Sequence, residues 1–338
     1  MRVLITGGVG FIGSHLTNRL NNDGAEVTII DMLGNSACLS RLNSKKIKII
    51  QSQIQNPSIW NQLDANYDLV INTAAETHVD HSFSKPQDFI NTNILGLHYV
   101  SKFCADHKIS LLHLSTDEVV GSGKPLFENS MTLPTNPYSA TKAAGENLLH
   151  AYGHCFNLDY KVIRLNNVYG TKQFPDKLIP LFINKLNNNQ KLPIHGNGKQ
   201  VRFFLHIDDL IEAIMIILKK GKTKNIYNVA TKESYTVLEV AKMICETMGK
   251  DSDENIQFVK DRLFQDPTYL SNSDKLHNLG WHPLRTLKET MPELVEWYTF
   301  NKDFFNIDRF HNLIVCRTSF YKQQLMKPKK GMQKEVFQ

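Results

Sequence analysis

Two hydroxyls and two carboxylates stand side by side at one point of the chain. Ser115-Thr116-Asp117-Glu118 follows an apolar run over residues 109–114 that is typical of a buried parallel strand. In an open α/β sheet, chemistry takes place at the carboxyl ends of the strands. Two carboxylates there can act as acid and base in an elimination, provided that one stays protonated. The alternative is a pair of solvated loop acids, because adjacent residues of an extended strand point to opposite faces unless the chain bends after Thr116.

A phenol and an ammonium lie one helical turn apart further on. Tyr138 and Lys142 fall in a predicted helix over residues 137–156, so their side chains share a face. An unperturbed tyrosine has a pKa near ~10, and a nearby ammonium favours the phenolate, so we expect Lys142 to lower the pKa of Tyr138. With Thr116 or Ser115 sharing the proton, this set can deprotonate an alcohol whose carbon gives up a hydride. The spacing alone occurs by chance in many helices.

A glycine-rich turn near the N-terminus supplies the context for such a hydride acceptor. Gly7, Gly10 and Gly13 lie between a short apolar run, residues 3–5, and a predicted helix over residues 12–22. In this strand–turn–helix setting, the glycines permit a tight turn, close approach to a pyrophosphate and close packing, and the helix N-terminus faces the phosphates. Asp31 ends the next predicted strand, where a carboxylate binds an adenosine ribose and favours NAD over NADP. The alternatives are an ordinary turn and an exposed strand-end aspartate.

The elements that position these groups alternate regularly up to residue 170. Strand and helix patterns follow one another, which predicts an α/β fold with a Rossmann-type doubly wound parallel sheet. We expect residues 1–170 to form the NAD-binding domain, with segments near 206–230 returning to it. Residues 171–320 would form a smaller α/β substrate-binding domain, with loops at 172–180 and 192–202, and residues 321–338 a basic tail.

The composition of the chain limits which partners and which cellular location we expect. The chain has 338 residues, five scattered cysteines without a Cys-x-x-Cys pair, and a formal charge of +6. We therefore expect no disulfide framework, no metal site and no nucleic-acid partner. No apolar run is long enough to span a membrane, and the chain enters its first strand directly after Met1-Arg2, without a signal-peptide pattern. These features predict a cytoplasmic protein.

The motifs resemble those of the nucleotide-sugar 4,6-dehydratases, above all the dTDP-glucose 4,6-dehydratase family, in the extended short-chain dehydrogenase/reductase superfamily. The similarity extends to about residue 298. The stretches that carry it are residues 6–14, 74–80, 115–119, 136–144, 167–170, 173–180, 194–198, 200–202, 226–228 and 279–281. The Thr116-Asp117-Glu118 triplet is the specific signal, since epimerases and decarboxylases of the superfamily carry other residues there.

The resemblance implies a reaction cycle and a set of binding residues. Tyr138 takes the sugar 4-hydroxyl proton as the C4 hydride passes to NAD, Glu118 removes the C5 proton, Asp117 protonates the departing 6-hydroxyl, and hydride returns to C6. The product is a 4-keto-6-deoxy sugar, as in rhamnose synthesis. The expected NAD-binding residues are Gly7, Gly10, Phe11, Ile12, Gly13, Asp31, Gln53, Ile54, Ala74, Ala75, Tyr138 and Lys142. The expected substrate-binding residues are Thr116, Asn167, Lys177, Leu178, Arg202, Asn228 and Arg262.

The resemblance also implies a homodimer, paired through the helices around Leu97 and Leu148. Several positions depart from the family pattern, namely Gln53, Val120, Phe203 and the run 263–266. None removes a catalytic group, but they leave open the nucleotide, dTDP or UDP, and the sugar. Two alternatives stay open as well: a nucleotide-sugar 4-epimerase or decarboxylase of the same superfamily, and an NAD-binding regulator without turnover.

Overall fold

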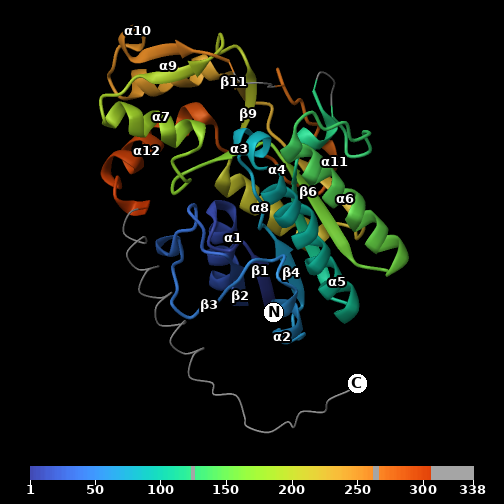
Figure 1. The fold of residues 1–338 in the computed structure, drawn as a ribbon. Helices are drawn as coiled ribbons and strands as arrows, with labels where there is room; N and C mark the ends of the chain where they lie inside the picture. The colour runs from blue at the N-terminus through green and yellow to red at the C-terminus, as the bar shows by residue number, and fades with distance from the viewer. Residues whose placement is uncertain (123–125, 262–265, 306–338) are drawn as a thin grey trace, which may run out of the picture. The chain divides into compact units, whose positions relative to one another are not determined.

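Seven parallel strands form the central sheet of the computed structural model, which describes residues 1–122, 126–261 and 266–305 (Figure 1). The strand order is β10-β6-β5-β4-β1-β2-β3. The strands are β1 (Arg2–Thr6), β2 (Glu26–Asp31), β3 (Lys48–Gln51), β4 (Leu69–Asn72), β5 (Ser110–Thr116), β6 (Tyr160–Leu165) and β10 (Asn225–Val229). The order reverses between β1 and β4, so this sheet is the predicted doubly wound Rossmann type, and the prediction of the fold class is confirmed.

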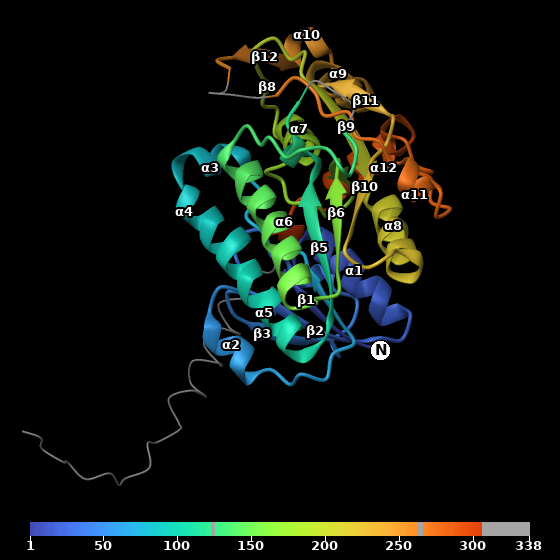
Figure 2. The same ribbon diagram turned by 90° about the vertical axis from the view of Figure 1, so that its right-hand side faces the viewer.

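Alternate residues of the strands face two separate apolar cores. Val3 and Ile5 of β1 belong to one core, whereas Leu4 between them belongs to the other. Such alternation follows from the two-residue period of a strand, and both faces must be covered in a parallel sheet. Helices α1 (Phe11–Asn22) and α8 (Ile207–Lys220) cover the first face, and α5 (Leu97–His107) and α6 (Pro137–Cys155) cover the second (Figure 2).

Shorter helices connect these layers. They are α2 (Pro57–Gln62), α3 (Val79–Ser84) and α4 (Pro86–Phe89), with a 3₁₀ turn at Leu39–Arg41. A π-helical segment, Ile90–Gly96, lies between α4 and α5. Asn93 inside that segment bonds to the loop after β4, which is a tertiary contact that helical periodicity does not report.

Two small sheets and several helices form the upper part of the molecule in Figure 1. The three-stranded sheet has the order β11-β9-β7, and β12 pairs with β8. The elements are β7 (Asn167–Tyr169), α7 (Leu178–Asn187), β8 (Leu192–His195), β9 (Val201–His206), β11 (Ser234–Thr236), α9 (Val237–Thr247), α10 (Ser252–Asn255), β12 (Ile256–Val259), α11 (Asp274–His277) and α12 (Leu287–Phe300). The prediction of a loop over residues 192–202 was therefore wrong, because β8 and the start of β9 lie there.

The described chain up to Lys302 forms one compact unit. Within it, β10 pairs with β6 in the main sheet, while the proposed division into two domains stays a prediction. The predicted basic tail and Cys316 lie outside the described residues. Among the helices of the described chain, none combines the length and apolar character that crossing a membrane requires.

Candidate active site

The chain bends directly after Thr116, the point where the sequence left the orientation of the two carboxylates open. Residues Asp117–Val120 form a 3₁₀ turn, and the Thr116 Oγ1 caps it by accepting the Glu118 N–H at 3.3 Å. The bend brings the two carboxyl groups close enough for the charge of Glu118 to raise the pKa of Asp117. Both acids also act on the pKa of Tyr138. The three predicted catalytic side chains therefore share one buried region.

Asp117 is 4% exposed. Its Oδ2 accepts a hydrogen bond from Asn166 Nδ2 at 2.7 Å, and its Oδ1 accepts one from Thr116 Oγ1 at 3.3 Å. Burial, reinforced by the Glu118 charge, raises the pKa of Asp117 to about 7, while the hydrogen bonds and Arg202 oppose that rise. A carboxyl group with this pKa is partly protonated at neutral pH, as a general acid must be.

Glu118 has a partner of its own. Its Oε2 accepts a hydrogen bond from Asn136 Nδ2 at 3.0 Å. Burial raises the pKa of Glu118, and the Asn136 hydrogen bond together with the charges of Arg202 and Lys177 lowers it. Asn136 is also the N-cap of α6, where its Oδ1 accepts the Ser139 N–H at 2.8 Å. The cap that starts the helix of Tyr138 thus also holds the candidate base.

Tyr138 and Lys142 lie on α6, but the expected effect on the pKa of Tyr138 is absent. Burial raises the pKa of Tyr138 above its usual value, the two acids raise it further, and a hydrogen bond with Thr116 opposes the rise. Lys142 is 3% exposed and donates from Nζ to the Leu114 carbonyl oxygen at 2.5 Å. Burial lowers the pKa of Lys142 to about 8. The expectation that Lys142 would lower the pKa of Tyr138 was wrong for this structure, because burial is the largest cause of the shift and Lys142 is not among its causes.

A buried ion pair between Arg164 and Glu146 lies close enough to Lys142 to act on its pKa. Arg164 Nη2 lies 2.6 Å from Glu146 Oε2, with side chains 3% and 5% exposed. Ser115 Oγ donates to Glu146 Oε1 at 2.5 Å. Glu146 is one helical turn beyond Lys142, and its charge raises the pKa of Lys142 against the effect of burial.

The glycine turn is shaped as a cofactor cradle. Gly7 has a φ of +71°, and a Cβ at this residue would lie 2.7 Å from the Ala74 backbone. A Cβ at Gly13 would collide with the Gly7 carbonyl oxygen. Helix α1 begins at Phe11 with neither a side-chain cap at Gly10 nor an acidic residue in its first turn. An uncapped helix N-terminus beside a cramped backbone turn fits the pyrophosphate of a dinucleotide.

The remaining predicted cofactor residues lie around that turn. Asp31 ends β2, and its Oδ2 accepts the Val9 N–H at 3.0 Å while its Oδ1 accepts the Leu33 N–H at 2.8 Å. Gln53 is exposed just after β3, whereas the Ile54 side chain is buried in the core. Ala74 and Ala75 follow β4. The backbone of Ala74 packs against Gly7.

Of the residues expected on the substrate side, some lie near the acid pair and others do not. Arg202 and Lys177 act electrostatically on Glu118, Leu178 begins α7, and Asn167 is exposed at the start of β7. The prediction that Asn228 binds substrate stays a prediction, and the structure shows what its amide contacts. It is 1% exposed, and its Nδ2 donates to the carbonyls of Leu126 and Asn272, both at 3.0 Å. Arg262 lies outside the described residues.

Three amide side chains that the sequence analysis did not single out organise the site. Asn166 and Asn136 hold the two acids. Asn93 holds the loop of Ala74 and Ala75 by accepting the Glu76 N–H at 2.9 Å, and it donates to Thr141 Oγ1 on α6, also at 2.9 Å. The only sequence signal for Asn166 was its place one residue past a strand end.

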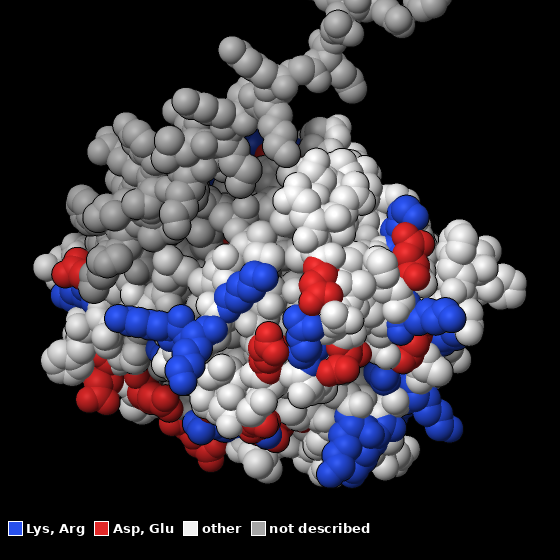
Figure 3. All heavy atoms as spheres, turned by 90° about the horizontal axis from the view of Figure 1, so that it is seen from below, with Lys and Arg blue, Asp and Glu red and all other residues white. Residues whose placement is uncertain are grey.

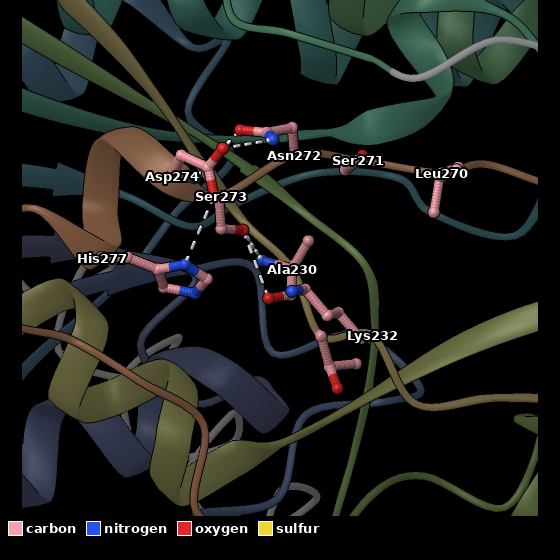
Figure 4. A pocket seen from close by; sticks show the side chains of 9 residues that line it. Ala230, Lys232, Leu270, Ser271, Asn272, Ser273, Asp274 and His277 are labelled. Carbon is pink, nitrogen blue, oxygen red and sulfur yellow. Dashed lines mark hydrogen bonds and ion pairs between the residues drawn. The ribbon is translucent and has the colours of Figure 1, made fainter.

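A cavity of about 170 Å³ lies beyond the carboxyl end of β10 (Figure 4). Thr231, Lys232, Ser271 and His277 are among the residues that line it, and Asp117 and Glu118 are not. Its wall is nevertheless connected to the acid pair, because Thr231 donates its N–H to Asn166 Oδ1 at 3.0 Å.

A dinucleotide-type cradle, with acid–base groups at the ends of neighbouring strands, defines a nucleotide-cofactor enzyme of the Rossmann class. The sequence pattern described as the NAD dependent epimerase/dehydratase family matches residues 3–230, and the chain belongs to that family.

Named relatives and solved structures agree with this assignment. A trifunctional UDP-glucose 4,6-dehydratase, 3,5-epimerase and reductase of Arabidopsis thaliana is 39% identical over 321 residues, covering 90% of this chain and 48% of the relative. The chain thus spans about half the length of that relative. The human dTDP-D-glucose 4,6-dehydratase is 38% identical, with 92% of this chain and 91% of the relative covered. The crystal structure of dTDP-glucose 4,6-dehydratase from Streptomyces venezuelae with NAD bound has a TM-score of 0.85 at 30% identity, covering 90% of this chain and 98% of that one.

Proposed function

We propose that the protein dehydrates a nucleotide-activated hexose, dTDP-glucose or UDP-glucose, to its 4-keto-6-deoxy derivative with bound NAD. The observation that carries the proposal is the pair of buried Asp117 and half-buried Glu118 beside Tyr138, with the pKa of both acids raised. A 4-epimerase needs the tyrosine relay but no second acid–base pair. Family membership and the dehydratase names of the relatives support the same reading.

The chain's own groups divide the proton transfers among them. NAD, when bound, supplies the hydride acceptor and donor. Tyr138 takes the proton of the 4-hydroxyl, assisted by Thr116, with which it is hydrogen-bonded. Glu118 takes the C5 proton, which a keto group at C4 makes acidic. Asp117, whose pKa is about 7, gives its proton to the departing 6-hydroxyl.

The cofactor and the substrate diphosphate would occupy different ends of this arrangement. Gly7, Gly10 and Gly13 with the N-terminus of α1 suit the NAD pyrophosphate. Lys177 and Arg202 supply cations close enough to act on Glu118, and a substrate diphosphate would form charge-assisted hydrogen bonds with them. We extend the proposal to Asn167 and Leu178 as substrate contacts.

The proposal also covers partners. We propose a homodimer through the helices α5 and α6. We also propose that the protein has no nucleic-acid partner, since its formal charge of +6 is mild. On the one face shown in Figure 3, Lys and Arg lie among Asp and Glu.

The test is incubation of the purified protein with UDP-glucose and dTDP-glucose, followed by mass spectrometry. We expect loss of one water from at least one of them, and loss of that activity in D117N and E118Q. D253N, at an exposed carboxylate of α10, is the matched control and should keep activity. An isomer of unchanged mass would identify an epimerase instead. Retention of NAD without turnover of any hexose nucleotide would identify the regulator.

A further inference from the structure

Asn166 connects the candidate acid to a neighbouring strand. It follows the last residue of β6 and is 4% exposed. Its backbone N–H donates to the Val229 carbonyl oxygen at 3.3 Å, at the end of β10. Its side chain donates from Nδ2 to Asp117 Oδ2 at 2.7 Å, the shorter of the two hydrogen bonds on that carboxyl group. Asn166, whose backbone is held by β10, therefore contacts Oδ2 of Asp117 and makes no hydrogen bond to Oδ1.

The orientation of the Asn166 amide follows from its second partner. Thr231, on the wall of the cavity in Figure 4, presents a backbone N–H at 3.0 Å. A backbone N–H can only donate, so the oxygen of the Asn166 amide must face Thr231 and its NH₂ must face Asp117. The hydrogen-bond network thus fixes which end of the Asn166 amide is oxygen and which is nitrogen.

We propose that Asn166 is a positioning residue that selects which oxygen of Asp117 carries the transferable proton. This inference rests on the proposed dehydration. The amide NH₂ of Asn166 can only donate and it occupies Oδ2, whereas the Thr116 hydroxyl near Oδ1 can turn and accept, so the proton is favoured on Oδ1. Oδ1 lies 3.3 Å from Thr116 Oγ1, on the side of the tyrosine relay.

The same contact favours the proton transfer itself. In the elimination, Glu118 takes the C5 proton, the C5–H electron pair forms the C5=C6 double bond, and the C6–O bond breaks. The Asp117 Oδ1 proton goes to the departing oxygen, which leaves as water, and Asp117 becomes a carboxylate. A hydrogen bond to an ionised oxygen is stronger than one to a neutral oxygen. Asn166 therefore stabilises the state that develops during the step more than the ground state.

Three other groups act on the acid and must be considered in any pH profile. Glu118 lies on the same 3₁₀ turn, Tyr138 on α6 and Arg202 on β9. The Asn166 hydrogen bond lowers the pKa of Asp117 against the effects of burial and Glu118. Loss of this donor should move the pH limb governed by Asp117 upward, by about one unit or more, since hydrogen bonds to charged groups are among the stronger ones.

The test compares two matched substitutions, N166D and N136D. Each keeps the oxygen that accepts a backbone N–H, from Thr231 or from Ser139, and each loses the NH₂ donor to one acid. Each is assayed over pH 5.5–9 with a hexose nucleotide and with its 6-fluoro-6-deoxy analogue, and rates are compared on the acid side of the Asp117 limb, where Asp117 carries its proton in wild type and variant alike. Fluoride departs without being protonated, but the C5 proton must still be removed. We expect N166D to slow elimination at least ten-fold with the 6-hydroxyl substrate and less than two-fold with the fluoro analogue.

We expect N136D to slow elimination with both the 6-hydroxyl substrate and the fluoro analogue.

The outcomes separate the possibilities. A selective loss in N166D, with the pH limb shifted upward, supports the proposal. Equal slowing of both substrates in N166D, or no slowing of either, overturns it. N166L, which lacks the new carboxyl group, must show the same selectivity and serves if N166D does not fold. A wild-type protein that eliminates from neither substrate removes the proposed function, and this inference with it.

Discussion

Replacing Asp117 by Asn should make the protein more stable, and increasingly so as the pH rises. The Asp117 pKa is about 7 in the folded chain, against 3.8 for an ordinary aspartate. The folded chain therefore holds this proton more tightly than the unfolded chain. Stability must fall as pH rises from about 3.8 to about 7, and then stay constant. D117N removes that loss, because its amide has no proton to release.

The magnitude follows from the size of the pKa difference. At about 1.36 kcal/mol for each pKa unit, the cost of the ionised, buried Asp117 reaches about 4 kcal/mol at alkaline pH. At pH 5.5 about half of that cost is already present, because the unfolded aspartate is ionised there. Between pH 5.5 and pH 8.5, the stability advantage of D117N over wild type should therefore grow by about 2 kcal/mol.

The assay is urea unfolding of wild type and D117N at pH 5.5 and pH 8.5, followed by circular dichroism. The control is D253N, which alters an exposed carboxylate on α10. Its difference from wild type should not grow with pH, and it should stay within about 0.5 kcal/mol. A D117N advantage that is the same at both pH values would refute the reasoning, because only a pH-dependent gain reports the raised pKa.

Three further changes test the scaffold. E146Q leaves the Arg164 charge unpaired in the core, so the free energy of unfolding should drop by about 3–5 kcal/mol; an unchanged urea midpoint would contradict this. In G13A, the new methyl group would collide with the Gly7 carbonyl, so the purified protein should contain less NAD than wild type, measured by its release on denaturation; an unchanged NAD content would contradict the assigned cradle. Iodoacetamide should alkylate the exposed Cys155 before the buried Cys104, whose thiol has a pKa raised by burial, and peptide mapping that found the reverse order would be inconsistent with the fold.

Local patterns were sufficient to predict the main sheet. β1, the glycine turn and α1 lie within two dozen residues, and each has a composition that tolerates few other structures. The short strands of the upper part were missed for a physical reason. β8 has four residues, and it becomes a strand by pairing with β12, which lies far along the chain. Residues this few carry too little periodicity to distinguish a strand from a loop.

The candidate site was predictable in its residue types but not in its geometry. Whether Asp117 and Glu118 face one region depended on the bend after Thr116, which the sequence could only pose as a question. Asn166 was overlooked because its importance arises from pairing between β6 and β10. Asn228 is predicted to bind substrate, and the structure shows that its amide joins the Leu126 and Asn272 backbones.

The failed expectation about Tyr138 leads to a more general point about this site. Asp117, Glu118 and Tyr138 have their pKa values raised, that of Lys142 is lowered, and burial is the largest cause in each case. Every shift favours the neutral form, so the pocket carries less charge at neutral pH than its residue types suggest. A diphosphate substrate would then meet little repulsion from the acids and would be drawn by Lys177 and Arg202. The same desolvation that makes Asp117 a proton donor thus also makes the pocket accessible to an anion, at the stability cost that D117N should reveal.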